Sequence, residues 1–205
     1  ILRYTGNGAT TDRTLSGTGY GSVILAGSGD LVWKGEISGG TTFHYTISNE
    51  SATARFVCAN KSITKFLNLV EGTKLGFSKP DDSDSISVAK ISVGGNVSID
   101  LIDGVTVKID EFTRTSGNIL VNSAPGAVLK IPSLAEGFAP DWLTVNGKAT
   151  YISPSGDVFA IDERQNDLVI AARGDVVPHA PGKVVGITTA GAATSGNDVL
   201  EENVT

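Results

Sequence analysis

The clearest structural signal in this chain is Val97-Ser98-Ile99-Asp100-Leu101, followed by Val105-Thr106-Val107-Lys108-Ile109. In both segments apolar and polar residues alternate, so the apolar side chains of an extended strand all point to one face. Between the segments stands Asp103-Gly104, a pair that breaks strands and favours a turn. Two short strands, each with one buried face, are therefore predicted here.

Similar runs of β-branched and aromatic residues recur along the chain at intervals of roughly 8 to 12 residues, with Gly, Asn and Ser between them. They cover residues 23–25, 31–33, 43–47, 55–58, 65–70, 75–77, 86–93, 97–102, 105–109, 119–121, 128–131, 143–145, 158–161, 168–170 and 176–177. Helix signals are weak. One helical turn is predicted for Ser133-Leu134-Ala135-Glu136-Gly137, with a capping serine and a terminating glycine.

The composition agrees with β-structure and excludes several classes of protein. Of the 205 residues 25 are glycine, well above the usual ~7%. A single cysteine excludes a disulfide scaffold, and no apolar run approaches the ~20 residues of a membrane-spanning helix. The net charge of -6, without a basic stripe, argues against a nucleic-acid partner.

Two all-β architectures fit short strands at this spacing. An antiparallel β-sandwich needs tight hairpins, for which Val145-Asn146-Gly147-Lys148 is the best candidate. A right-handed parallel β-helix (β-solenoid) needs short strands joined by Gly-, Asn- or Ser-rich corners around one continuous core. Most runs are too short and too numerous for a sandwich, so the pattern favours the β-solenoid, with coils of about 20 to 25 residues.

On this interpretation residues 1–205 form a single elongated β-solenoid of some seven to nine coils. The coils at about 50–130 are expected to be irregular, because this part is more charged, and residues 178–205 are expected to be rich in loops. The chain starts at Ile1 without a basic and apolar leader. It is therefore expected to be a processed or excised piece of a longer protein.

Segments near both ends resemble a known family. Leu2-Arg3-Tyr4-Thr5-Gly6, followed by Ala9-Thr10-Thr11-Asp12-Arg13-Thr14-Leu15, is similar to an opening segment of bacterial autotransporter passenger proteins with autotransporter-associated β-strand repeats. Trp142-Leu143-Thr144-Val145-Asn146-Gly147, then Phe159-Ala160, resembles a closing block of the same proteins, and so does the stretch 186–204.

The resemblance implies a parallel β-helix in an exported region that is displayed at the cell surface or released. Such passengers carry adhesive, structural or occasionally enzymatic functions, and the repeat itself has no catalytic motif. A non-enzymatic structural or adhesive role is therefore expected, in which loops and strand faces contact a partner. The expected partner is a glycan or a protein at the cell surface, or another copy of the chain that binds through open coil ends. Two alternatives stay open: a carbohydrate-active β-helix enzyme (a polysaccharide lyase or glycosidase) and a subunit of an end-to-end fibre.

Candidate metal-binding and nucleophilic residues are few. Asp81, Asp82 and Asp84 form the densest carboxylate cluster and offer the oxygen ligands that calcium prefers. They lack the spacing of a known calcium loop, so a solvated turn is predicted. No partner ligands for zinc accompany His44 or His179, and Cys58 is expected to be a small buried hydrophobe.

A glycan-cleaving site would need carboxyl groups gathered on one face of the solenoid. The candidates are Asp100, Asp103, Asp110, Glu111, Asp157, Asp162 and Glu163, with Arg114 and Arg164 nearby in sequence. No spacing singles out a pair, so no catalytic, cofactor-binding or metal-binding residue is assigned. Aromatic rings could stack on sugars, but these aromatic residues are expected to cap the solenoid core instead: Trp33, Trp142, Tyr4, Tyr20, Tyr45 and Tyr151.

Overall fold

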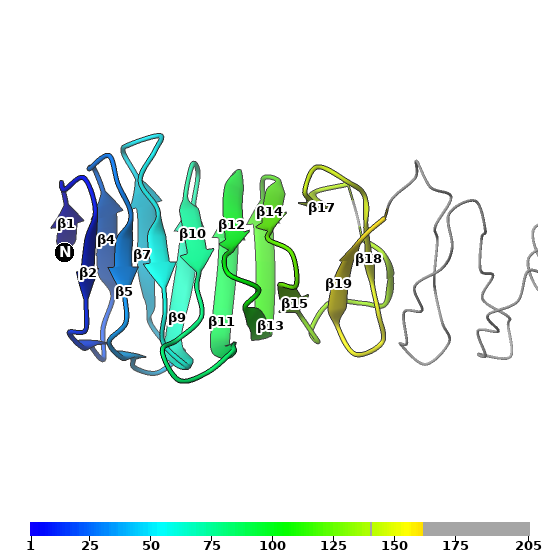
Figure 1. Cartoon of the computed structure of the whole chain (residues 1–205), viewed down its shortest axis with the longest axis horizontal. Helices are drawn as coiled ribbons and strands as arrows, with labels where there is room; N and C mark the ends of the chain where they lie inside the picture. The colour runs from blue at the N-terminus through cyan, green and yellow to red at the C-terminus, as the bar shows by residue number, and fades with distance from the viewer. Residues whose placement is uncertain (140, 162–205) are drawn as a thin grey trace, which may run out of the picture.

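The computed structural model describes residues 1–139 and 141–161, and this part of the chain contains strands but no helix. Parallel strands stack into a β-solenoid of about 6 turns (Figure 1). The predicted all-β solenoid is therefore confirmed, and the antiparallel sandwich is not formed. The runs predicted at 168–170 and 176–177 and the loop-rich end at 178–205 lie outside the described residues.

Two sheets run side by side along the solenoid from the blue N-terminal strands of Figure 1; sheet B ends at β17, and sheet A continues to the yellow strands β18 and β19. Sheet A contains, in spatial order, β1 (Leu2–Tyr4), β4 (Gly21–Leu25), β7 (His44–Asn49), β9 (Ser62–Val70), β11 (Ser85–Gly94), β13 (Thr106–Ser116), β15 (Val128–Lys130), β19 (Asp157–Ala160), β18 (Thr150–Ile152) and β16 (Gly137–Phe138). The short strands β3 (Leu15–Ser16) and β6 (Ile37–Ser38) pair with each other, and β6 also pairs with β9.

Sheet B is parallel throughout. It contains β2 (Ala9–Thr11), β5 (Leu31–Trp33), β8 (Phe56–Cys58), β10 (Lys74–Phe77), β12 (Val97–Leu101), β14 (Ile119–Ser123) and β17 (Leu143–Val145). The strands of both sheets are short because each coil turns a corner after a few residues. Backbone groups are then satisfied by the coils before and after, rather than within one coil.

The register between coils shows the coil length directly, because register partners occupy equivalent positions in successive coils. Phe56 of β8 pairs with Leu31 in the coil before it and with Leu75 in the coil after it. In sheet A, Val23 of β4 pairs in the same way with Leu2 and with Ile47. The sequence separations within these pairs lie at or close to the predicted coil length of about 20 to 25 residues.

The core lies between the two sheets, where apolar side chains stack in columns along the solenoid. In sheet B one such column runs through Phe56, Leu75, Ile99 and Val121, each at most 1% exposed. Each fully buried side chain of this size contributes about 1.5–3 kcal/mol relative to exposure. The fold is therefore held by stacked apolar columns and backbone ladders, as expected of a chain without disulfides.

The last described coil departs from the parallel pattern. Strand β19 pairs antiparallel with β15, and β18 pairs antiparallel with both β19 and β16. The tight turn predicted at Asn146-Gly147 is present: both residues have positive φ, 51° and 74°, and Val145 and Lys148 exchange backbone hydrogen bonds. A turn typical of antiparallel hairpins thus occurs at the end of a parallel stack.

The helical turn predicted for residues 133–137 is wrong. Gly137 begins strand β16 with φ 127°, and the Ser133 Oγ accepts a hydrogen bond from the backbone N–H of Phe112 at 3.0 Å. The serine satisfies a strand of the neighbouring coil instead of capping a local helix. Contacts between coils have therefore overridden a local signal.

Candidate functional site

The outer face of sheet A carries a row of aromatic side chains that crosses three coils. His44 of β7 is the register partner of Phe66 of β9, and the pairing of Gly21 with Tyr45 places Tyr20 next to His44. We call Tyr20, His44 and Phe66 the aromatic column. Tyr20 is 69% exposed, so one end of this column is open to solvent.

The rings of the aromatic column contact one another edge to face. The ring centroids of Tyr20 and His44 are 4.9 Å apart with planes at 71°, and those of His44 and Phe66 are 5.2 Å apart at 66°. Phe43, which is 37% exposed, lies 4.9 Å from Tyr20 in the same arrangement. Such perpendicular pairs are favoured by the charge distribution of aromatic rings.

An ion pair continues this row into the next two coils. Lys90 of β11 is the register partner of Phe66 and of Glu111. Its Nζ atom lies 5.0 Å from the Phe66 ring centroid and 2.5 Å from Oε1 of Glu111. The lysine charge is therefore balanced by a carboxylate on one side and faces an aromatic ring on the other.

A second row, of small polar side chains, runs beside the first and two residues further along each strand. Its members are in register from coil to coil and form what we call the polar column: Ser22, Thr46, Asn68, Ser92 and Thr113. Within the part of the chain that the structure describes, none of these five side chains makes a hydrogen bond. The polar column therefore offers unused hydroxyl and amide groups on an outer face.

A buried lysine supports the exposed end of the aromatic column. The side chain of Lys65 is fully buried, and its Nζ atom donates hydrogen bonds to the carbonyl oxygens of Gly17 and Gly19, at 3.1 and 3.0 Å. The same atom lies 4.9 Å from the Tyr45 ring centroid. Because a buried charge is costly unless it has such partners, these contacts fix the loop that leads into Tyr20.

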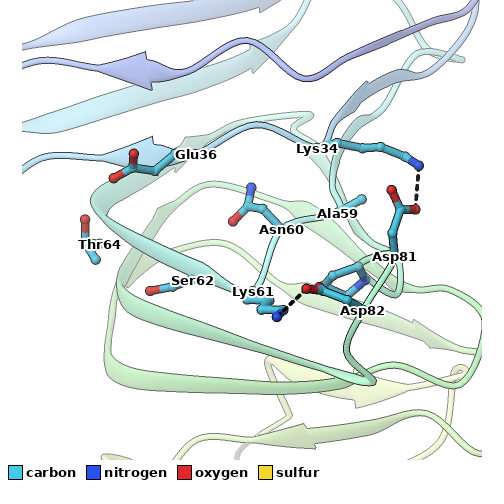
Figure 2. A pocket seen from close by; sticks show the side chains of 10 residues that line it. Lys34, Glu36, Ala59, Asn60, Lys61, Ser62, Thr64, Asp81 and Asp82 are labelled. Atoms are coloured by element: carbon cyan, nitrogen blue, oxygen red, sulfur yellow. Dashed lines mark hydrogen bonds and ion pairs between the residues drawn. The ribbon is translucent and has the colours of Figure 1, made fainter.

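A pocket of about 610 Å³ lies at a corner of the solenoid, where residues 59–64 meet the loop that contains Asp81 and Asp82. Figure 2 shows two ion pairs at one side of this pocket: Lys34 with Asp81, at 2.6 Å, and Lys61 with Asp82, at 2.5 Å. Glu36 and Thr64 lie at the opposite side. The two ion pairs thus hold the loop that contains Asp81 and Asp82 against two different coils.

The carboxylates predicted to form a solvated turn point to three separate lysines. Asp81 and Asp82 pair with Lys34 and Lys61, and Asp84 pairs with Lys79 at 2.9 Å. All three carboxylates are at least 69% exposed. Among residues 1–139 and 141–161 there is no group of three or more His, Cys, Asp or Glu residues suited to a metal ion.

Among residues 1–139 and 141–161, no two of the candidate acids share a hydrogen-bond or ion-pair partner. Each has its own partner: Asp100 binds Arg55 and Asn122, Asp103 binds Ser78, Asp110 pairs with Lys108, Glu111 pairs with Lys90, and Asp157 pairs with Lys130. Arg114 lies over the ring of Trp142. Asp162, Glu163 and Arg164 lie outside the described residues.

Two residues of these ion pairs, Arg55 and Asp157, have shifted pKa values. Hydrogen bonds to Asp30, and also to Asp100, raise the pKa of Arg55 despite the opposing effect of its burial. Burial acts to raise the pKa of Asp157, but hydrogen bonds from Ser155 and Lys130 outweigh it and lower the pKa. A general acid needs a raised carboxyl pKa, so Asp157 is suited to an ion pair rather than to proton donation.

Most of the remaining sequence candidates are structural. Cys58 is fully buried, as predicted, and burial raises the pKa of its thiol. Trp33, Tyr45 and Tyr151 are buried and so cannot stack on a ligand at the surface, but Tyr20 is exposed, and the expectation that it covers the core is wrong. The other two aromatic candidates, Tyr4 and Trp142, are half-buried. The candidate His179 lies outside the described residues.

Sequence reasoning missed Phe43 and Phe66 as surface aromatics and did not find the polar column. Comparison of the chain with protein-family models, curated proteins and solved structures gave no match. The part of the chain that the structure describes has no helix long and apolar enough to cross a membrane. The outer face of sheet A, with its aromatic and polar columns, is the candidate functional site.

Proposed function

We propose that this chain is a non-enzymatic, extracellular binding segment of an exported bacterial surface protein, and that it holds carbohydrate on the outer face of sheet A. The observation that carries the proposal is the aromatic column, with its exposed end at Tyr20, beside the unused polar groups of the polar column. The extracellular placement rests on the resemblance of both end segments to autotransporter passengers.

The two columns match the two kinds of surface that a sugar presents. A pyranose ring has apolar C–H faces, and an aromatic side chain can bury them while the sugar hydroxyls stay hydrogen-bonded. Serine, threonine and asparagine side chains both donate and accept hydrogen bonds, as sugar hydroxyls do. Since the columns lie two residues apart on the same strands, one ligand can contact both.

Rigidity supports a binding role for this face. The strands of sheet A are paired on both sides along most of its length, and Lys65 holds the loop before Tyr20. A surface that is already ordered loses little conformational entropy when a ligand binds. The separate partners of Asp100, Asp103, Asp110, Glu111 and Asp157, the candidate acids within the described residues, support binding rather than catalysis by these five carboxyl groups.

A panel of immobilised polysaccharides tests the proposal. We expect the protein to be retained by at least one of them, and Tyr20→Ala to weaken that binding by about tenfold or more, as for an interface hot spot. Leu120→Ala is the matched control, because Leu120 is 39% exposed on the outer face of sheet B. Retention by none of the polysaccharides, or equal binding by the two variants, would contradict the proposal.

A further inference from the structure

We infer that the ligand of this face is a linear, uncharged polysaccharide that lies along the solenoid axis, parallel to the aromatic and polar columns. This inference rests on the proposed function of sheet A and specifies the class of its ligand. It is drawn from three features of the outer face: the direction of the columns, their width, and the balance of charge.

The direction follows from the register. The polar column has one member on each of five neighbouring strands, β4, β7, β9, β11 and β13. Neighbouring strands are about 4.8 Å apart, so five members span roughly 19 Å across the strands. A chain that ran along a single strand would meet one member of each column, whereas a chain along the axis can meet them all.

The two columns also differ in where along the axis they act. Aromatic rings occupy the first three positions of their row, from Tyr20 to Phe66, whereas unused hydroxyls continue two coils further, to Ser92 and Thr113. A short oligosaccharide can therefore use the rings alone. A longer one gains hydrogen bonds at Ser92 and Thr113, so affinity should increase with the number of sugar units.

The width of the surface favours an unbranched chain. Residues two apart on a strand are about 7 Å apart, so the two columns bound a track about one sugar ring wide. The next positions beyond the polar column do not continue its pattern: Ile24, Val70 and Gly94 are apolar, and the two hydroxyls of this row, Ser48 and Ser116, are separated by Val70 and Gly94. A branch in this direction would meet no row of free hydroxyls.

The balance of charge favours a neutral ligand. Lys90 is paired with Glu111 at 2.5 Å, and Lys108 on the same sheet is paired with Asp110 at 2.6 Å. The polar column has no charged member. An acidic polysaccharide would therefore meet Glu111 without an unpaired cation in either column to compensate it, and like charges that are forced together weaken binding.

The test begins with a panel of immobilised neutral linear, neutral branched and acidic polysaccharides, here cellulose, chitin, mannan, a branched arabinoxylan, alginate and polygalacturonate. Oligosaccharides of about two, four and six units from a retained neutral chain are then titrated calorimetrically. The key variant is Thr113→Val, which removes a hydroxyl at the far end of the polar column. Thr144→Val is its matched control, because Thr144 lies on sheet B in strand β17.

We expect retention by a neutral linear chain and an affinity that increases from the shortest to the longest oligosaccharide. Thr113→Val should lower the affinity for the longest oligosaccharide about fivefold, as for the loss of one hydrogen bond, and leave the affinity for the shortest one unchanged. Thr144→Val should leave the affinity for every length unchanged. Retention only by acidic or branched chains, affinity that is independent of length, or an equal effect of Thr113→Val on all lengths overturns the inference but not the proposed function. Retention by no polysaccharide, or binding to a protein partner instead, overturns both.

Discussion

The ammonium nitrogen of Lys65 lies 3.0 Å from the carbonyl oxygen of Gly19, the residue directly before the exposed Tyr20. A second carbonyl, of Gly17, accepts a hydrogen bond from the same atom. A fully buried cation thus links the interior of the solenoid to the loop that presents the most exposed aromatic ring of sheet A. Stability and binding should therefore both depend on Lys65.

The variant Lys65→Met tests this link. Methionine fills a similar volume but leaves the carbonyls of Gly17 and Gly19 without their donor, which costs roughly 1–3 kcal/mol of unfolding free energy. We expect the urea midpoint to fall and carbohydrate retention to weaken. Lys61→Met, at a side chain 55% exposed in its ion pair, is the control and should change stability by less than ~0.5 kcal/mol. Equal effects of the two variants would show that Lys65 has no special role.

Because the coils pack closely at their corners, we expect Gly117→Ala to lower the stability of the fold strongly. A Cβ atom on Gly117 would lie 1.9 Å from the carbonyl carbon of Gly95, and its φ of +80° also disfavours other residues. We expect a marked fall in the thermal midpoint, or failure to fold. In contrast, Gly40→Ala should be close to neutral, because nothing lies within 4 Å of the added atom. If Gly117→Ala unfolded at the wild-type temperature, the coils could not be stacked this closely.

The contact between the Glu71 carboxylate and Asn96 of the next coil predicts that Glu71 contributes to the free energy of unfolding in a pH-dependent way. Hydrogen bonds from the backbone N–H and side-chain amide of Asn96 lower the pKa of Glu71. Because the pKa of Glu71 is lower in the folded state, the carboxylate stabilises the folded protein at pH values above the unfolded-state pKa of about 4.3. That stability is lost as the pH falls through the folded value.

We therefore expect Glu71→Gln to lower the urea midpoint at about pH 7 and to have almost no effect at about pH 2, where the carboxyl group is protonated. Glu36→Gln is the control, because the Glu36 carboxylate makes no ion pair or hydrogen bond within the described residues. If the urea midpoints of Glu71→Gln and the wild type differed by the same amount at both pH values, the hydrogen bonds between Glu71 and Asn96 would not be the cause.

Burial predicts that Cys58 is unreactive in the folded protein. Its side chain is fully buried between the sheets, and burial raises its thiol pKa, so little of the reactive thiolate is present. An alkylating reagent at neutral pH should label the cysteine in urea and leave it unlabelled in buffer, as measured by mass spectrometry. Rapid labelling in buffer would mean that β8 is open to solvent.

The sequence was sufficient to predict the fold class because two signals are local. Alternation such as Val97-Ser98-Ile99-Asp100-Leu101 predicts one buried face, and the number of short runs favours stacked coils over a sandwich. The strands that no run predicted are the short ones at the corners and ends, β1, β2, β3, β6, β16 and β18. They are too short to carry a pattern, and they exist because a neighbouring coil pairs with them.

The candidate site could not be predicted in the same way, because register is not local. Tyr20, His44, Phe66 and Lys90 come from four successive coils, and their spacing in the sequence is uneven. Coils of unequal length and the irregularity between Val88 and Lys90 hide the alignment. Only the pairing of strands shows that these side chains share one face. The one available sequence signal was that Tyr20 and Phe66 are out of phase with the apolar residues that follow them, Val23 and Leu25 after Tyr20, and Leu67 and Leu69 after Phe66.

The central claim is that the aromatic and polar columns of sheet A form the binding face. The most direct measurement is a titration of the isotope-labelled protein, followed by backbone amide NMR, with a soluble fragment of a polysaccharide that retains it. The account predicts shifts at residues 20–22, 44–46 and 66–68, with those of Lys34, Lys61 and Asp82 at the corner pocket unchanged. Shifts confined to the corner pocket, with the columns unaffected, would contradict it.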